Sequence, residues 1–257
     1  MKANSLPAIS GLNWLQGGYA IYRRNPAFLV LICMTYWALV ILINLVPLLG
    51  PIAASIVMPA LSVSVMNACR DLDDGRPPLP GVIFSGFREG RKTLFLLGGL
   101  YLALSLGIVL FSALLDGGAM LRFLLTAKTP EATASDPFLS ALTPLVILGL
   151  FTPVFMAYWY APILAAWYRL PIFKALFFSF IACWRNWSAF LVYGLVLVVL
   201  LLFVPAVVLT LVILILPSLQ GLATAFLVFP VLLIAMPIVF ASFYVSYRDV
   251  FGVSELA

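Results

Sequence analysis

The sequence predicts an all-α membrane protein, a polytopic bundle of six transmembrane helices. Hydrophobic residues make up 65% of the 257 residues and charged residues only 9%, whereas soluble domains carry about 25% charged residues. The mean hydropathy is +1.18, and apolar residues run on over stretches of about 20 residues, the length that crosses a bilayer core as a helix. A membrane-spanning β-barrel would instead show short strands of alternating polarity.

Six apolar runs follow one another, separated by Pro, Gly and charged residues. Several runs are longer than the about 20 residues that a crossing helix needs, which predicts tilted or kinked helices. Together they form a single transmembrane domain over residues 1–257. The predicted spans are about Pro26–Val46, Pro51–Cys69, Thr93–Leu115, Leu139–Tyr168, Ser188–Leu216 and Leu222–Tyr247.

A repeat relates the first and last pairs of spans. The segments Tyr22–Val30 and Trp184–Val192 both pass from an aromatic residue and Arg to Ala-Phe-Leu-Val. Pro59 and Pro237 each precede an Arg-Asp pair by eleven residues. Self-similarity of this kind indicates repeated units, here three related helical hairpins. The hairpins cover about residues 10–70, 80–169 and 171–249.

A short amphipathic segment leads into each hairpin. Apolar side chains recur at helical spacing beside basic residues, which is typical of helices lying in the membrane interface. The alternative is that these segments are frayed ends of the spans. The apolar positions are Leu12, Leu15, Tyr19 and Tyr22 before span one, Ile83 and Phe87 before span three, and Phe173, Leu176, Phe177, Phe180 and Trp184 before span five.

The basic residues predict the orientation. Of the 14 Lys and Arg residues, all but Arg122 and Lys128 fall on one side of the predicted spans. Cytoplasmic loops carry the excess of Lys and Arg in membrane proteins. We therefore expect both termini in the cytoplasm and the polar stretch Asp116–Pro137 outside it. The net charge of +5 then follows from this bias, and no nucleic-acid partner is expected.

Several kinds of chemistry are disfavoured. The chain has no His, which removes His-based acid–base catalysis and the usual nucleophile–His pairs. Three carboxylates within Asp71–Asp74 do not match a calcium-loop spacing, and Arg70 and Arg76 flank them, so a solvated turn is favoured over a cation site. We expect no catalytic, cofactor-binding or metal-binding residues and no enzyme activity. Buried free thiols are expected at Cys33, Cys69 and Cys183.

The spans carry no charged residue at mid-depth, which disfavours an ion-coupled transporter. Four aromatic residues lie well inside the spans instead, where they could line an apolar pocket for a lipid tail or hydrophobic solute; aromatic packing is the alternative. These are Tyr36, Trp37, Tyr158 and Trp159. An anionic phospholipid head group would then rest among basic residues at the cytoplasmic surface. Those are Arg23, Arg24, Lys174 and Arg185.

Small residues at four-residue steps predict close helix packing in two spans. They are Ala60, Ser64 and Ala68 in the second span and Gly99, Ala103 and Gly107 in the third. The partner helix could belong to the same bundle, or to a second copy of the chain in a homo-oligomer.

Short motifs give the chain a family resemblance. They are Trp14–Gly18, Arg24-Asn25-Pro26, Cys69–Pro77 and Ile83–Arg88. With them the chain resembles an uncharacterised family of proteobacterial six-span inner-membrane proteins of unknown function. The resemblance implies a bacterial inner membrane and brings no functional residues with it.

Two classes of function fit these observations. The first is a non-enzymatic inner-membrane protein that handles lipid or a hydrophobic solute, or that maintains the envelope. The second is a structural or assembly partner of other membrane proteins. An ion-coupled transporter ranks below both.

Overall fold

The structure is a computed structural model that describes residues 3–215 except 78, 89, 120 and 123–136, together with residues 218, 221 and 229–252. Every regular element in this part of the chain is a helix, and six helical segments are long and apolar enough to cross a membrane. The predicted all-α, six-span class is confirmed. The elements are α1 (Ser10–Arg24), α2 (Pro26–Asn44), α3 (Leu49–Asp73), η1 (Pro80–Phe87), α4 (Arg91–Asp116), α6 (Pro137–Trp159), α7 (Ala161–Trp167), α8 (Ile172–Arg185), α9 (Trp187–Val198), η2 (Val199–Phe203), α10 (Val204–Ile215), η4 (Val231–Ala235) and α12 (Met236–Phe251).

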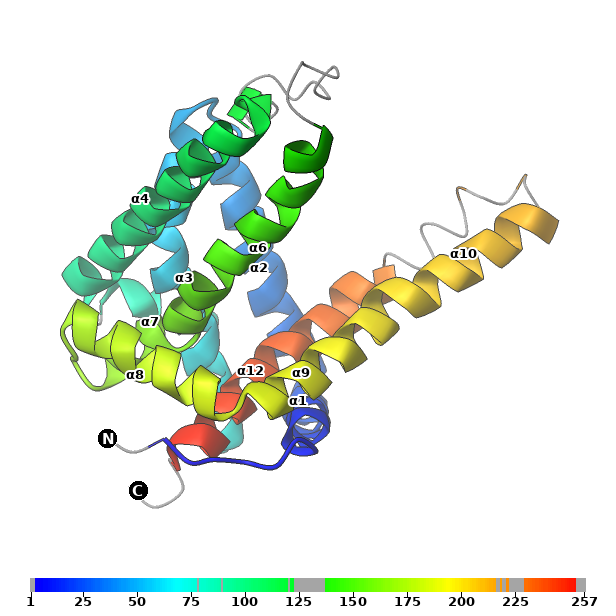
Figure 1. Ribbon diagram of the computed structural model, residues 1–257. Helices are drawn as coiled ribbons and strands as arrows, with labels where there is room; N and C mark the ends of the chain where they lie inside the picture. Colours follow the sequence, from blue (N-terminus) through cyan, green and yellow to red (C-terminus); the bar gives the residue numbers. More distant parts are fainter. Residues whose placement is uncertain are drawn as a thin grey trace.

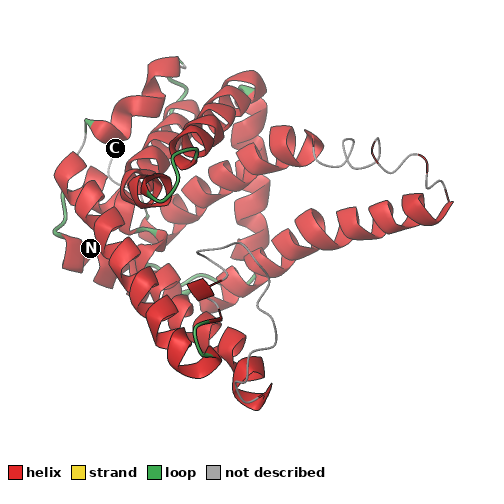
Figure 2. Ribbon diagram, turned by 90° about the horizontal axis from the view of Figure 1, so that it is seen from above, coloured by secondary structure: helices red, strands yellow, loops and turns green. Residues whose placement is uncertain are grey.

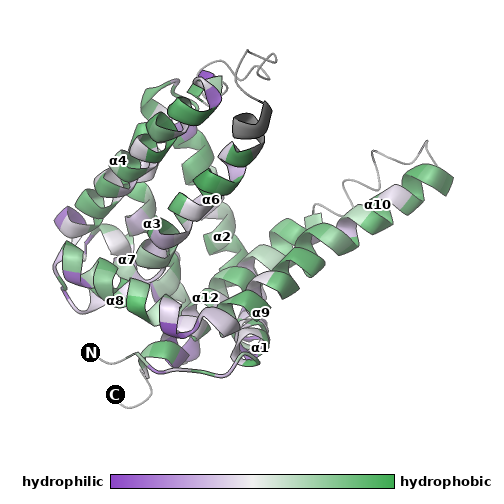
Figure 3. Ribbon diagram, in the orientation of Figure 1, coloured by the Kyte–Doolittle hydropathy of each residue, from purple (hydrophilic) through white to green (hydrophobic). Residues whose placement is uncertain are grey.

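The first four spans pack side by side. α2 lies against α3, α3 against α4, and α4 against α6, as Figure 1 shows. The chain breaks at Tyr160 between α6 and α7, where Pro162 occupies the first turn of the new helix, a position that proline favours. Hydrophobic residues cover the long helices, while hydrophilic residues gather near their ends (Figure 3).

The last two spans leave this group as two diverging arms (Figures 1 and 2). One arm is the continuous run α9–η2–α10 and the other is η4–α12. Each arm contains a π-helical turn followed closely by a proline, Pro205 after η2 and Pro237 after η4. The first arm has 29 residues and is therefore about 43 Å long. Since the bilayer core is about 30 Å thick, this arm must tilt to lie within it.

The three-hairpin repeat stays a prediction. In the first hairpin α2 and α3 lie against each other. The arms of the third hairpin meet at the hydrogen bond between Tyr193 and Ser242 (2.8 Å) and then separate. The predicted counterparts Pro59 and Pro237 both lie inside a span, but Pro59 interrupts regular α-helix whereas Pro237 closely follows the π-helical turn η4.

Helix α1 connects the two arms through glycines. A Cβ atom at Gly11 would lie 2.2 Å from the carbonyl oxygen of Ala189 in α9, and one at Gly18 would lie 2.6 Å from the amide nitrogen of Ser242 in α12. Only hydrogen in place of a side chain permits backbones to approach this closely. Trp14, between these glycines, is fully buried.

Each predicted lead-in segment is a helix of its own, namely α1, η1 and α8; their location in the membrane interface stays a prediction. α1 gives way to α2 because Asn25 adopts an extended backbone and its side chain accepts a hydrogen bond from the Phe28 amide (3.1 Å). The related Asn186 does not cap its helix. Its amide group instead bonds the backbone of Asn4 and Leu6 (2.9 and 2.8 Å) and so holds the N-terminal segment.

Candidate functional site

A cavity of about 500 Å³ lies among α2, α3, α4, α6 and α7. Three tyrosines line it together with shorter polar side chains. No charged residue is among its lining residues. The polar lining residues are Tyr36, Asn44, Ser55, Ser62, Tyr101 and Tyr158.

The cavity reaches from mid-bundle to one end of the protein. Asn44 is the last residue of α2, and Pro51 lies in the first turn of α3, so both mark the α2–α3 turn. Tyr36 lies eight residues before Asn44, which corresponds to about 12 Å along the helix. The cavity therefore opens toward the α2–α3 turn. The opposite end of the protein holds α1, η1, α8 and most described basic residues, and we call it the basic end.

A proline shapes one wall of the cavity. Pro59 lies inside α3, has no N–H and leaves the Ser55 carbonyl without its helical partner. This carbonyl lies against Gly98 of α4, where an added Cβ atom would come within 2.5 Å of the oxygen. Close approach at a small residue, with Cα–H groups beside carbonyls, is typical of helix contacts in membranes.

The structure brings two of the four predicted aromatic residues into one site. Tyr36 and Tyr158, 122 positions apart in the sequence, both line the cavity. Trp37 packs edge-on against Tyr36 with ring centroids 5.5 Å apart. Trp159 lies elsewhere and packs edge-on against Phe190 and Phe243 of the third hairpin.

Tyr101 is a lining residue that sequence reasoning missed. Its ring packs edge-on against Tyr158 with centroids 5.2 Å apart. A helical pattern could have found it, since Leu94, Leu97 and Gly98 are the buried residues before it on α4 and Tyr101 continues this face. The Tyr158 hydroxyl is buried and has no hydrogen-bond partner in the described part of the chain.

At the basic end, Asp73 joins three parts of the fold. Its carboxylate pairs with Arg248 of α12 (2.8 Å) and Arg24 of α1 (3.3 Å) and accepts a hydrogen bond from the Tyr244 hydroxyl (3.3 Å). The Arg24 guanidinium also donates to the Leu72 carbonyl (2.8 Å). We call this group the Asp73 clasp. It ties the lead-in helix, the first hairpin and the last helix together.

The neighbouring carboxylates also form ion pairs with an arginine. Asp71 and Asp74 both pair with Arg76, and the hydrogen bond to Asp74 raises the pKa of the Arg76 guanidinium. Among the described residues, no group of acidic, Cys or His side chains could hold a metal ion. Asp71 and Asp74 are thus held in ion pairs within the fold.

The four predicted head-group contacts are not gathered. Arg24 belongs to the Asp73 clasp. Arg23, Lys174 and Arg185 are exposed, and Arg23 lies over the ring of Tyr19 at 5.9 Å. Arg23 lies at one end of α1, whereas the other end of α1 adjoins α9, which follows Arg185; the length of α1 separates these ends by about 20 Å.

Comparison with known proteins places the chain in a family. It is 35% identical over 264 residues to a probable inner membrane protein of Burkholderia thailandensis, an alignment that covers 99% of this chain and 96% of the relative. The chain belongs to this family of inner membrane proteins. No family model matches it, and no solved structure does. The predicted family resemblance and the multi-pass inner-membrane location are confirmed, while the orientation of the termini stays a prediction.

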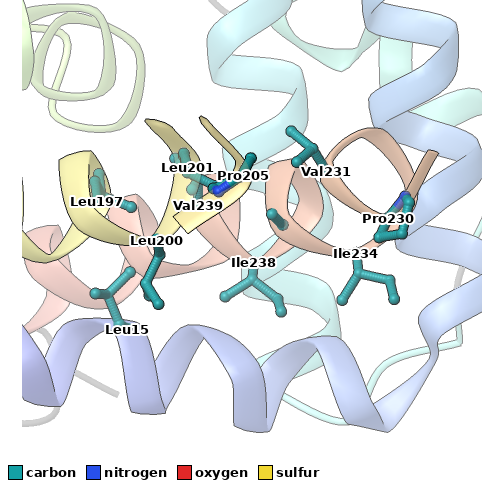
Figure 4. A pocket seen from close by; sticks show the side chains of 11 residues that line it. Leu15, Leu197, Leu200, Leu201, Pro205, Pro230, Val231, Ile234, Ile238 and Val239 are labelled. Atoms are coloured by element: carbon teal, nitrogen blue, oxygen red, sulfur yellow. The ribbon is translucent and has the colours of Figure 1, made fainter. Parts of the chain in front are cut away.

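As an inner membrane protein, the chain offers apolar clefts beside the third hairpin. One, of about 350 Å³, lies between the two arms, with Leu200 on one arm, Ile234 on the other and Leu15 of α1 beneath them (Figure 4). A second, of about 620 Å³, lies between η4 and the start of α2 at Pro26 and Val30. The first cleft is lined by apolar side chains alone, and Tyr22 is the one lining residue of the second cleft with a polar side-chain group.

Proposed function

We propose that this inner membrane protein binds a lipid or another hydrophobic molecule without changing it chemically. The observation that carries the proposal is the uncharged cavity lined by Tyr36, Tyr101 and Tyr158. Its volume of about 500 Å³ lies within the about 300–1,000 Å³ of small-molecule sites, which combine apolar walls with a few polar groups.

The lining chemistry favours binding over catalysis. The side chains offer hydroxyl groups, one amide and apolar surface, with no carboxylate, amine or thiol among them. A general acid or base needs a pKa near the operating pH, and tyrosine and serine hydroxyls are far from it. A molecule held here would be apolar, with an uncharged polar group that the hydroxyls can bond.

The position of the cavity indicates how the molecule enters. Asn44 and Pro51 place one end of the cavity at the α2–α3 turn. In the orientation predicted from the basic residues, this turn faces the periplasm. With this orientation, we propose that the molecule enters from the periplasmic half of the membrane and that its binding serves maintenance of the envelope.

Filling the cavity tests the proposal. Ser62→Phe adds bulk to a lining residue, while Ala38→Phe adds the same ring to an exposed position of α2, two residues from Tyr36. Native mass spectrometry of both variants, purified with bound membrane molecules, should show a co-purifying species lost from Ser62→Phe and kept by Ala38→Phe. Equal retention by the two variants would contradict the proposal.

Tyr158→Phe separates ligand binding from folding. A buried hydroxyl without a partner costs stability, so its removal should leave the melting temperature unchanged or raise it. If the hydroxyl bonds a ligand, the same variant should retain less of the co-purifying species. A fall in melting temperature without any change in retention would assign Tyr158 to folding alone.

A second candidate function is assembly with another membrane protein or a second copy of the chain. In α3 the small residues are used internally, because the Ser64 hydroxyl accepts a hydrogen bond from the Gly86 amide of η1 (3.0 Å). On α4, an added Cβ atom at Gly99 or Gly107 would meet nothing within 4 Å among the described residues. A small-residue face of this kind suits a helix from outside the chain. Gly99→Leu with Gly107→Leu should then lower the oligomer mass in detergent.

A further inference from the structure

Four basic side chains surround the point where α4 begins. Arg88 follows η1, Arg91 and Lys92 open α4, and Arg169 follows α7. Gly90 brings the two regions together, since an added Cβ atom there would lie 3.7 Å from the Ala165 carbonyl oxygen of α7. We call these four residues the basic crest. All four side chains are exposed.

The crest has no counter-charge in the described part of the protein. The aspartates at this end already pair with Arg24, Arg76 and Arg248. No crest side chain forms an ion pair or hydrogen bond with another described residue, whereas the arginines just named all do. Glu89 lies outside the described residues. Even with this residue counted as charged, the crest keeps a net charge of +3.

The local backbone adds to this excess of positive charge. α4 starts after Gly90, which has no side chain to cap the helix, and its first turn contains no acidic residue. Cations at a helix N-terminus are unfavourable because they repel the positive end of the helix dipole. An anion bound among Arg91, Lys92 and the free amide groups would reverse this effect.

Arg169 stands at a position that usually belongs to glycine. Its φ is +52°, in the left-handed region, and it directly follows Tyr168, the C-cap residue of α7. Glycine is the common residue there because a Cβ atom disfavours this conformation. An arginine at this position lowers local stability. We therefore expect its side chain to contribute to ligand binding instead of folding.

The surroundings favour a lipid as the source of the anion. Phe84 of η1 and Leu96 of α4 are 52% and 61% exposed, and α4 continues from the crest as a membrane span. A phosphate bound at the crest would therefore belong to a molecule whose apolar part can lie along these side chains. We infer that the basic crest binds the head group of an anionic phospholipid, a site separate from the tyrosine-lined cavity.

Charge removal tests the site. Arg91→Gln with Lys92→Gln removes two crest charges, and Arg23→Gln with Arg185→Gln removes two exposed charges at the same end but outside the crest. Native mass spectrometry with added phosphatidylglycerol should show about fivefold weaker binding for each crest charge removed, the equivalent of about 1 kcal/mol per basic residue. The control pair should lose less than twofold, and phosphatidylcholine binding should not change. Equal losses in both pairs, or no selectivity for phosphatidylglycerol, would overturn the inference.

Arg169→Gly distinguishes lipid binding from a structural role. Glycine relieves the left-handed backbone, so the variant should melt at the same or a higher temperature in detergent without anionic lipid, and phosphatidylglycerol should stabilise it less than the wild type. A lower melting temperature without lipid would assign Arg169 to folding and overturn its place in the site. Displacement of phosphatidylglycerol by millimolar inorganic phosphate would identify a site for free phosphate instead.

Discussion

Two adjacent glycines of α4 give a sharp test of how α3 and α4 pack. A Cβ atom at Gly98 would lie 2.5 Å from the Ser55 carbonyl oxygen and 2.6 Å from the Ile56 Cα atom, whereas one at Gly99 would meet nothing within 4 Å. Ordinary contacts of a Cβ atom lie at 3.4 Å or more, so Gly98→Ala must separate the helices by about 1 Å. Overpacking of this kind costs about 1–3 kcal/mol.

Gly99→Ala is the matched control, because it adds the same methyl group one residue away. It should leave stability unchanged or raise it by up to about 1 kcal/mol, since alanine favours a helix over glycine. Thermal unfolding of both variants in the same detergent measures the difference. Equal melting temperatures would show that α3 and α4 do not approach each other at Gly98. This result would contradict the α3–α4 contact described for the cavity wall.

Further predictions concern the basic end and the orientation. Asp73→Asn removes the shared acceptor of two arginines and should lower stability by about 1–2 kcal/mol; this is less than for a fully buried pair because those arginines are 48% and 35% exposed. Asp74→Asn, at an exposed pair, should change stability by less than about 0.5 kcal/mol, and equal effects would contradict the clasp. Burial disfavours the thiolate and raises the pKa of the Cys183 thiol to about 12, so maleimide should not label the buried cysteines of the folded protein at pH 8; labelling before unfolding would refute this. Cysteine placed at Asp74 should react only from the cytoplasm and cysteine at Ser135 only from the periplasm, and the reverse pattern would invert the predicted topology.

The spans could be predicted closely because apolar length alone determines them. The predicted first span, Pro26–Val46, is observed as Pro26–Asn44. Its start is marked by the capping Asn25 before it and by Pro26, its first residue. Side-chain roles were harder to predict. Asn25 and Asn186 occupy related places in the sequence, yet one caps its own helix and the other holds the N-terminal segment, since that role depends on distant residues.

The candidate site could be predicted only in part for the same reason. Depth within the spans selected Tyr36 and Tyr158 together with two tryptophans, but depth does not say which side of a helix faces which neighbour. Trp159 adjoins Tyr158 in sequence and points to another contact, because successive helical residues are about 100° apart. The Asp73 clasp was also not predicted, because its arginines come from opposite ends of the chain. Nor does sequence indicate how far the arms of the third hairpin diverge.

The central claim is that the tyrosine-lined cavity holds a hydrophobic molecule in the membrane. An electron cryo-microscopy structure of the protein in nanodiscs made from native lipid extract tests it most directly. We predict elongated non-protein density in the cavity between Tyr36 and Tyr101, extending toward the α2–α3 turn and absent from the Ser62→Phe variant. A cavity closed by side-chain packing, or one that holds only water in both proteins, would contradict the account.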